Sequence, residues 1–236
     1  MELTHPQLKR KARIAGILYF LIGVFSFYGV MYVSSQIQVM GDAQATFNNL
    51  LDNEFLFRTG IYAHLLNTVV FTMMVLVFYH MFSHIHKYLA QIMVAFVILH
   101  ISFEFGAQVF NYTAMMLAKG QLLESIELLQ RQEWVYLFLR TAKYGSVGLA
   151  IVFWGIWLIP LGILVIKSGF IPKIFGIMLI AGGVAYILDS MTFILFPGAG
   201  STFKTILMVV FSVAEISFIF WLLIKGISNP KSQRSM

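Results

Sequence analysis

Six apolar stretches, each about 20 residues long or longer, constrain the fold of this chain more than any other feature. A helix needs about 20 apolar residues to cross the roughly 30 Å hydrocarbon core of a bilayer. The predicted spans are residues 14–34, 58–82, 89–114, 137–166, 174–196 and 204–225. Their residues are apolar in blocks and not in alternation, which favours helices over the strands of a membrane β-barrel. The sequence therefore predicts an all-α fold, a polytopic transmembrane bundle of six helices.

Composition supports a lipid-embedded protein and excludes several kinds of chemistry. Hydrophobic residues make up 59% of the chain and charged residues only 11%, whereas soluble domains carry about 25% charged residues. The chain contains no cysteine, which excludes disulfides, thiol catalysis and cysteine-bound zinc or iron–sulfur clusters. The net charge is +6, but the basic residues flank the apolar spans. We therefore predict membrane lipids as partners and no nucleic acid.

The distribution of lysine and arginine predicts the orientation of the bundle, because cytoplasmic loops are enriched in these residues. With both termini in the cytoplasm, only three basic residues fall on the outer loops, namely Lys119, Arg131 and Lys204. The inner side then receives Lys9, Arg10, Lys11, Arg13, Lys87, Lys167, Lys173, Lys225, Lys231 and Arg234.

Two long outer loops are predicted to hold surface helices. One covers residues 42–55, with Asp42 as its N-cap. The other covers residues 120–133, where leucine and isoleucine alternate with glutamate and glutamine in an amphipathic pattern typical of interfacial helices. No low-complexity segment or linker interrupts the chain, so residues 1–236 are predicted to form a single integral membrane domain.

Three carboxylates lie inside the predicted spans, namely Glu104, Asp189 and Glu215. A charge in hydrocarbon costs several kcal/mol unless it is paired, hydrated or neutralised, so such residues usually mark a function or an essential internal contact. Further polar residues in or beside the spans are candidate partners: Arg58, His64, Asn67, His100, Gln108, Arg140 and Lys143.

These groups are predicted to share one polar pocket in the outer half of the membrane. His100, Glu104 and Gln108 are spaced by four residues and therefore form one stripe along their helix. Mutual neutralisation of the three acids by Arg58, Arg140 and Lys143 would reduce the cost of burying them. We expect Glu104 to lie beside at least one of His64, His100, Arg140 and Lys143.

Two other interpretations of the same residues remain open. His64, His100, Glu104 and Asp189 carry side chains that suit a divalent metal, but the two histidines differ in depth by about 10 Å on the helical rise. We therefore predict neither a metal site nor a cofactor. Alternatively, the polar groups are structural ion pairs that fix the helix register. Ser146 has small neighbours but no evident histidine partner, so it is interpreted as a packing residue.

Several motifs carry a resemblance to a known family. They are the Gly41-Asp42-Ala43 turn, the segment from Glu54 to Arg58, the Ser168–Gly176 connection, and the glycine-rich run that ends at Asp189 and Ser190. With these motifs the sequence resembles the domain of unknown function 4386 family of prokaryotic membrane proteins over nearly its whole length. The resemblance implies a single-domain, multi-pass protein and brings no catalytic residues with it.

The sequence thus predicts a multi-pass protein of a prokaryotic cytoplasmic membrane. It is expected to bind or transport a small polar or ionic solute in an outward-facing pocket. An intramembrane metal-dependent lipid hydrolase is the first alternative, and a structural or partner-binding membrane subunit is the second. The sequence does not decide whether the protein is an enzyme, and it does not specify the oligomeric state.

Overall fold

The computed structural model describes residues 4–196, 198 and 200–228, and all of the regular structure in this part of the chain is helical. Six helical segments are long and apolar enough to cross a membrane. They are His5–Ile37, Glu54–Phe82, Lys87–Ala118, Leu128–Ser168, Lys173–Leu195 and Ser201–Ile224. The shortest has 23 residues, which at about 1.5 Å per residue is enough to span a hydrocarbon core of about 30 Å. The predicted six-helix architecture is confirmed.

Four of the spans are single α-helices, and two are interrupted by π-helical turns. The uninterrupted helices are α4 (Glu54–Phe82), α5 (Lys87–Ala118), α8 (Lys173–Leu195) and α9 (Ser201–Ile224). The first span consists of α1 (His5–Ser26), the π-helix η1 (Phe27–Val33) and α2 (Ser34–Ile37). The fourth consists of α6 (Leu128–Lys143), the π-helix η2 (Tyr144–Leu149) and α7 (Ile151–Ser168).

The described residues form two compact units, each assembled from separate parts of the sequence. The first unit draws on Met1–Phe20, Val70–Ile101 and Gly148–Met236. The second unit draws on Leu21–Val69 and Ser102–Val147. The division falls inside helices α1, α4 and α5. No single cut of the chain therefore separates the units, and the single domain predicted from sequence stays a prediction.

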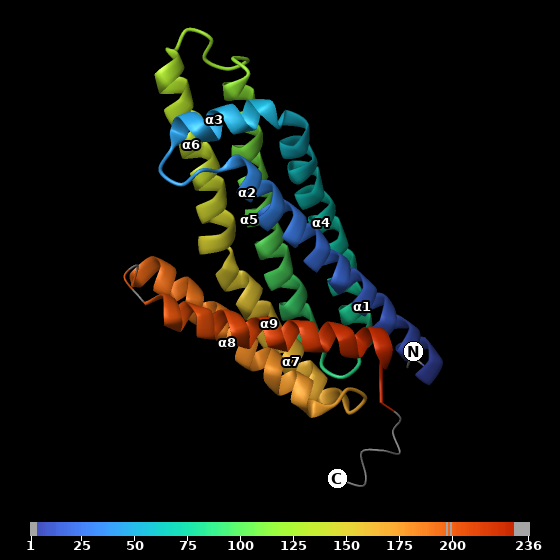
Figure 1. Cartoon of the computed structure of the whole chain (residues 1–236). Coiled ribbons are helices and arrows are strands. Elements are labelled where there is room, and N and C mark those ends of the chain that lie inside the picture. Colours follow the sequence, from blue (N-terminus) through green and yellow to red (C-terminus); the bar gives the residue numbers. More distant parts are fainter. Residues whose placement is uncertain (1–3, 197, 199, 229–236) are drawn as a thin grey trace. The chain divides into compact units, whose positions relative to one another are not determined.

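In the first unit, glycines bring α7 and α8 into close contact, and α8 runs alongside α9 (Figure 1). A Cβ atom added to Gly155 would lie 2.5 Å from the carbonyl oxygen of Gly183, and one added to Gly162 would lie 2.6 Å from that of Gly176. Such contacts are how helices associate in lipid, where the hydrophobic effect does not drive them together. These glycines are therefore packing residues at the contact between α7 and α8.

In the second unit, the short helix α3 (Ala43–Asp52) packs against α6. The side chain of Asp42 accepts a hydrogen bond of 2.8 Å from the backbone N–H of Ala45, which confirms the predicted N-cap. A cluster of buried apolar side chains joins η1, α2, α3 and α6 to the start of α4 and the end of α5. It contains Val33, Ile37, Phe47, Leu50, Phe57, Ala114, Met115, Leu117, Ala118, Val135 and Leu139.

The predicted surface helix over residues 120–133 is wrong. Residues 120–127 form turns, and α6 begins at Leu128. Gly120 has φ +69 and Leu123 has φ +52, and neither angle fits a right-handed helix. The N–H of Gln121 donates to the carbonyl of Met116 at 3.0 Å, a bond that closes the end of α5. The amphipathic pattern instead reflects a polar loop followed by the first turns of α6.

The orientation of the termini stays a prediction from the basic residues. Two of the residues used for it, Lys231 and Arg234, lie outside the described residues.

Candidate functional site

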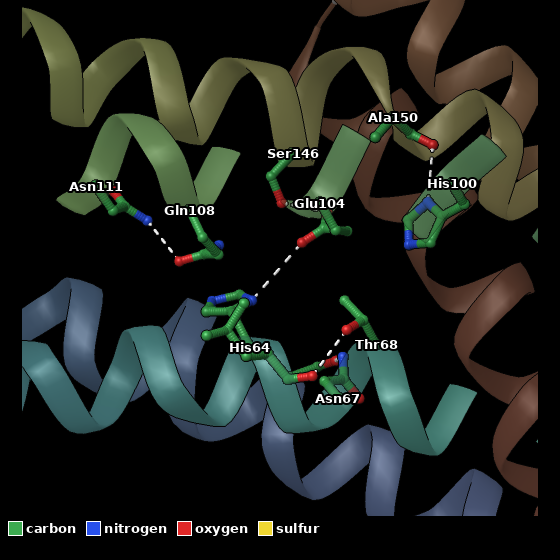
Figure 2. Close-up of polar contacts among 11 residues, drawn as sticks. His64, Asn67, Thr68, His100, Glu104, Gln108, Asn111, Ser146 and Ala150 are labelled. Carbon is green, nitrogen blue, oxygen red and sulfur yellow. Dashed lines mark hydrogen bonds and ion pairs between the residues drawn. The ribbon is translucent and has the colours of Figure 1, made fainter. Parts of the chain in front are cut away.

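In the second unit, Glu104 on α5 links residues from two other helices. Its Oε1 accepts a hydrogen bond of 2.5 Å from Ser146 Oγ, and its Oε2 lies 3.6 Å from His64 Nδ1. Figure 2 shows the carboxylate between the Ser146 hydroxyl on one side and the His64 ring on the other. The His64 and Glu104 side chains are only 11% and 13% exposed. The expectation that Glu104 lies beside one of the named histidines or bases is confirmed for His64.

Two amide side chains continue the polar stripe of α5. The Nδ2 group of Asn111 donates to Gln108 Oε1 at 3.0 Å, and Gln108 is buried (Figure 2). The bond from Asn111 uses the Gln108 oxygen, and the Gln108 NH₂ group is the end of this amide that can donate to a ligand. On α4, Asn67 donates to Ser26 Oγ at 3.2 Å, while its own Oδ1 is buried without a hydrogen-bond partner.

His64, Gln108 and Asn111 line a small cavity in the second unit. Its volume is about 50 Å³. The wall contains Gly29, Val30, Val33, Ser34, Ile37, Gln38, Phe57, Gly60, Ile61, His64, Ala107, Gln108, Asn111, Ala142, Lys143, Ser146 and Val147. A water centre needs about 10–15 Å³ of such space, so the cavity has room for roughly three to five waters or one small ion. Pockets for organic ligands are usually about 300–1,000 Å³.

Lys143, at the end of α6, is the one permanently charged side chain among the described residues of this wall. It is half-buried and makes no ion pair with any of the acids in the described part of the chain. The Oε1 atom of Gln38, another wall residue, is buried without a hydrogen-bond partner. The cavity therefore offers one ammonium group and several neutral donors and acceptors to whatever occupies it.

Both π-helical segments contribute to the cavity wall. η1 provides Gly29, Val30 and Val33, and η2 provides Ser146 and Val147. An ideal Cβ on Gly29 would lie 2.7 Å from His64 Nε2, so a glycine is needed at this point for the imidazole to fit. π-Helical turns frequently occur at functional sites because they redirect side chains that an α-helix would point elsewhere. Here η2 places Ser146 beside Glu104, and η1 places the backbone of Gly29 against the His64 ring.

Glu215 lies in the first unit, on α9, and is 7% exposed. Its carboxylate accepts hydrogen bonds from the hydroxyls of Tyr19 and Tyr186, the latter at 2.5 Å. The indole N–H of Trp154 is shared between the two carboxylate oxygens at 3.1 and 3.2 Å. Three neutral donors, and no base among the described residues, thus satisfy this acid. The structure gives it the hydrogen bonds that a buried carboxylate requires.

Asp189 and His100 also belong to the first unit. Asp189 on α8 is half-buried and within electrostatic range of Lys204. The Nδ1 atom of His100 lies 3.2 Å from the carbonyl oxygen of Ala150 (Figure 2). The His100 ring packs edge-on to Trp154, with the ring centres 4.9 Å apart. The predicted polar residues are thus divided between two units, and the single pocket shared by all three acids stays a prediction.

The other two predicted bases have partners within the second unit. Arg58 pairs with Glu54 at 2.6 Å, and Glu54 also contacts Lys119 at 2.9 Å. Arg140 packs over the ring of Tyr144, with its guanidinium 4.5 Å from the ring centre, and donates to the Tyr144 hydroxyl. The structure therefore gives Arg58 an acid that the sequence analysis had not considered for it.

Four residues of the two polar sites were not predicted from the sequence. Ser146 was assigned to packing, although it is a hydrogen-bond partner of Glu104. Tyr19, Tyr186 and Trp154 surround Glu215 but give no periodic signal, because aromatic residues are common throughout membrane helices. The i, i+4 spacing of Glu54 and Arg58 was a usable signal, since such pairs meet on a helix surface.

No three histidine, aspartate or glutamate side chains gather into a metal-binding group within residues 4–196, 198 and 200–228. Of the metal candidates, His64 and Glu104 lie next to each other, but they are not part of a group of three such side chains in the described residues. The metal-dependent hydrolase therefore gains no cluster of ligands from the described residues.

The fold and the polar sites define a membrane protein with a bundle of six apolar helices. The sequence matches the model of a family described as "Domain of unknown function (DUF4386)" over residues 14–226. The chain therefore belongs to this family, as its motifs predicted.

A curated relative gives a further comparison. It is an uncharacterized protein of Archaeoglobus fulgidus and is 40% identical over 86 residues, or 36% of this chain. The matched part is 49% of that protein, so the chain spans about half the length of this relative. No solved structure matches the chain.

Proposed function

We propose that the second unit binds one small monovalent anion in the cavity beside Lys143, and that the protein moves this anion together with a proton. The observation that carries the proposal is an ammonium group without an acidic partner among the described residues, on the wall of a cavity of about 50 Å³. A half-buried cation is stabilised by a counter-ion, and here the protein supplies space for one.

The size of the cavity selects the class of solute. A space for roughly three to five waters suits a halide or a similarly small anion with residual water. It is too small for a sugar, an amino acid or a lipid headgroup. Within the small polar or ionic solutes predicted from sequence, the cavity size therefore favours an inorganic ion.

The charges around the cavity couple the anion to a proton. With His64 neutral, Glu104 and Lys143 carry opposite charges, so the group has no net charge, although the two side chains form no ion pair. With His64 protonated, the imidazolium pairs with Glu104 at 3.6 Å, and the charge of Lys143 is left unbalanced. One anion then restores neutrality. Because linkage is reciprocal, protonation of His64 strengthens anion binding, and the anion strengthens proton binding.

Neighbouring groups assist in defined ways. The Gln108 NH₂ group can donate to an anion, since the bond from Asn111 uses only the Gln108 oxygen. Ser146 donates to Glu104 and so orients the carboxylate toward His64. The unpartnered Gln38 oxygen is an acceptor for a water that shares the cavity.

The proposal assigns the protein to the cytoplasmic membrane of a prokaryotic cell, with both termini inside and the cavity reached from outside. The distribution of lysine and arginine supports this orientation. The archaeal relative supports a prokaryotic setting.

Thermal unfolding of the purified protein in detergent tests the proposal, with chloride, bromide or nitrate exchanged against gluconate at constant ionic strength. Gluconate is too large for the cavity and serves as the reference. An anion at 100 times its Kd stabilises by about 2.7 kcal/mol, which corresponds to roughly 5–11 °C for a chain of this size. The stabilisation should be larger at pH 5.5 than at pH 8, because the proton and the anion bind together.

Three variants separate the roles. Lys143→Met should abolish the stabilisation, whereas replacement of an exposed lysine that does not line the cavity, Lys167→Met, should retain it. His64→Gln should make the effect of the anion the same at both pH values. If Lys143→Met were stabilised by chloride as strongly as the parent protein, the proposal would be wrong, and the structural-subunit alternative would be preferred.

A further inference from the structure

A second site lies on the surface of α6, in an open groove of about 510 Å³. Its wall consists of Glu133, Trp134, Tyr136, Leu137, Arg140 and Tyr144. It therefore combines an acid, a base, three aromatic rings and an exposed leucine. The groove is about ten times larger than the cavity beside Lys143, and it falls within the usual size range for organic ligands.

Arg140 is held in this groove by contacts that leave its charge unneutralised. Its guanidinium lies 4.5 Å from the ring centre of Tyr144 and 6.0 Å from that of Tyr136, and its two amino groups donate to the Tyr144 hydroxyl and, at 3.3 Å, to the sulfur of Met40. No acid in the described part of the chain is within ion-pair distance of it. Arginine presents five N–H donors in a planar fork that matches a phosphate group, and these contacts occupy only part of the fork.

Glu133 lies at the other end of the groove. It is exposed and forms no ion pair with any residue that the structure describes. It precedes Arg140 by seven residues, or about 10 Å along the helix. The loop before α6 carries Glu124 and Glu127, so Glu133 lies nearer the water and Arg140 nearer the hydrocarbon.

We propose that this groove binds one phospholipid with a zwitterionic, amine-bearing headgroup, with its phosphate on Arg140 and its ammonium on Glu133. In such a lipid the phosphate lies nearer the glycerol and the ammonium farther out, which is the order of the two charges along α6. Trp134, Tyr136 and Tyr144 suit the headgroup level, where aromatic side chains concentrate. Leu137 is 55% exposed and offers an apolar surface to the start of an acyl chain.

The lipid site does not depend on the proposed anion site. The two share no lining residue, since the groove uses Arg140 and the cavity uses Lys143. A substitution that abolishes lipid binding should therefore leave anion binding unchanged, and a substitution that abolishes anion binding should leave lipid binding unchanged.

Native mass spectrometry of the delipidated protein tests the inference, with phosphatidylethanolamine and phosphatidylglycerol of identical acyl chains added in competition. The parent protein should retain phosphatidylethanolamine preferentially at a stoichiometry of one. Arg140→Gln should weaken binding of both lipids, by about tenfold for phosphatidylethanolamine. Glu133→Gln should remove the preference and bind the two lipids equally. Lys167→Gln, which removes a cation elsewhere, should behave as the parent.

One further variant and one competition experiment distinguish lipid binding from misfolding and from simple phosphate binding. Arg140→Lys retains the charge at this position and should bind more lipid than Arg140→Gln, provided that circular dichroism shows both variants folded. Excess inorganic phosphate should not displace the lipid. The inference is overturned if phosphate alone displaces it, if Arg140→Gln retains the parent's lipid binding, or if Glu133→Gln keeps the preference for phosphatidylethanolamine.

Discussion

Replacing Glu215 by leucine should destabilise the protein strongly. The substitution removes the acceptor shared by the hydroxyls of Tyr19 and Tyr186 and the indole N–H of Trp154. Each buried donor left unsatisfied costs about 1–3 kcal/mol, so the three together cost about 3–9 kcal/mol. Rotation of the two hydroxyls toward other acceptors would bring the loss toward the lower end of this range. Tyr186→Phe alone removes one buried hydrogen bond and should cost about 0.5–1.5 kcal/mol.

A combined variant tests whether the unsatisfied donors cause the loss of stability. Glu215→Leu together with Tyr19→Phe and Tyr186→Phe leaves only the indole N–H unsatisfied, so about two-thirds of the lost stability should return. Equilibrium unfolding in mixed detergent micelles, followed by circular dichroism, measures the free energy of unfolding of the parent, these three variants and a control. Tyr62→Phe is the matched control, because Tyr62 is 63% exposed. The reasoning is refuted if Glu215→Leu is as stable as Tyr62→Phe, or if the triple variant is less stable than Glu215→Leu.

Two other predictions concern topology and packing. Cysteines introduced at Asn48 and Ser168 in this cysteine-free chain should react with a membrane-impermeant maleimide from opposite sides of the membrane; labelling from one side would contradict the orientation. Gly155→Ala places a Cβ 2.5 Å from the carbonyl oxygen of Gly183 and should cost at least about 1–3 kcal/mol in thermal unfolding. Gly145→Ala meets no atom within 4 Å and should be neutral or slightly stabilising; equal losses at both positions would argue against tight packing of α7 on α8.

The sequence was sufficient to predict the fold class because the spans are set by a single physical requirement. A helix must match the thickness of the hydrocarbon core, and the lengths of the apolar blocks express this directly. The N-cap of α3 was predictable for a similar reason, since the Asp42 side chain acts within one turn. The helix predicted over residues 120–133 was wrong because the amphipathic pattern does not reveal a backbone with positive φ at Gly120 and Leu123.

The site was only partly predictable, because its partners come from different helices. The helical period placed Glu104 and Gln108 on one stripe, and His64 was among the neighbours expected for Glu104. The contact between Ser146 and Glu104 depends on the π-helical turn η2, which shifts the register of side chains and has no evident sequence signature. The aromatic partners of Glu215 were missed because an acid in a membrane span was expected to pair with a base.

Crystals of the protein grown in sodium bromide can locate the anion proposed to occupy the cavity beside Lys143, through the anomalous scattering of bromide. We expect an anomalous peak in the cavity, within contact of Lys143 Nζ and the Gln108 amide. The peak should disappear in Lys143→Met crystals grown in the same way. A well-measured map without a peak in this cavity, or a peak that persists in Lys143→Met, would contradict the proposed anion site.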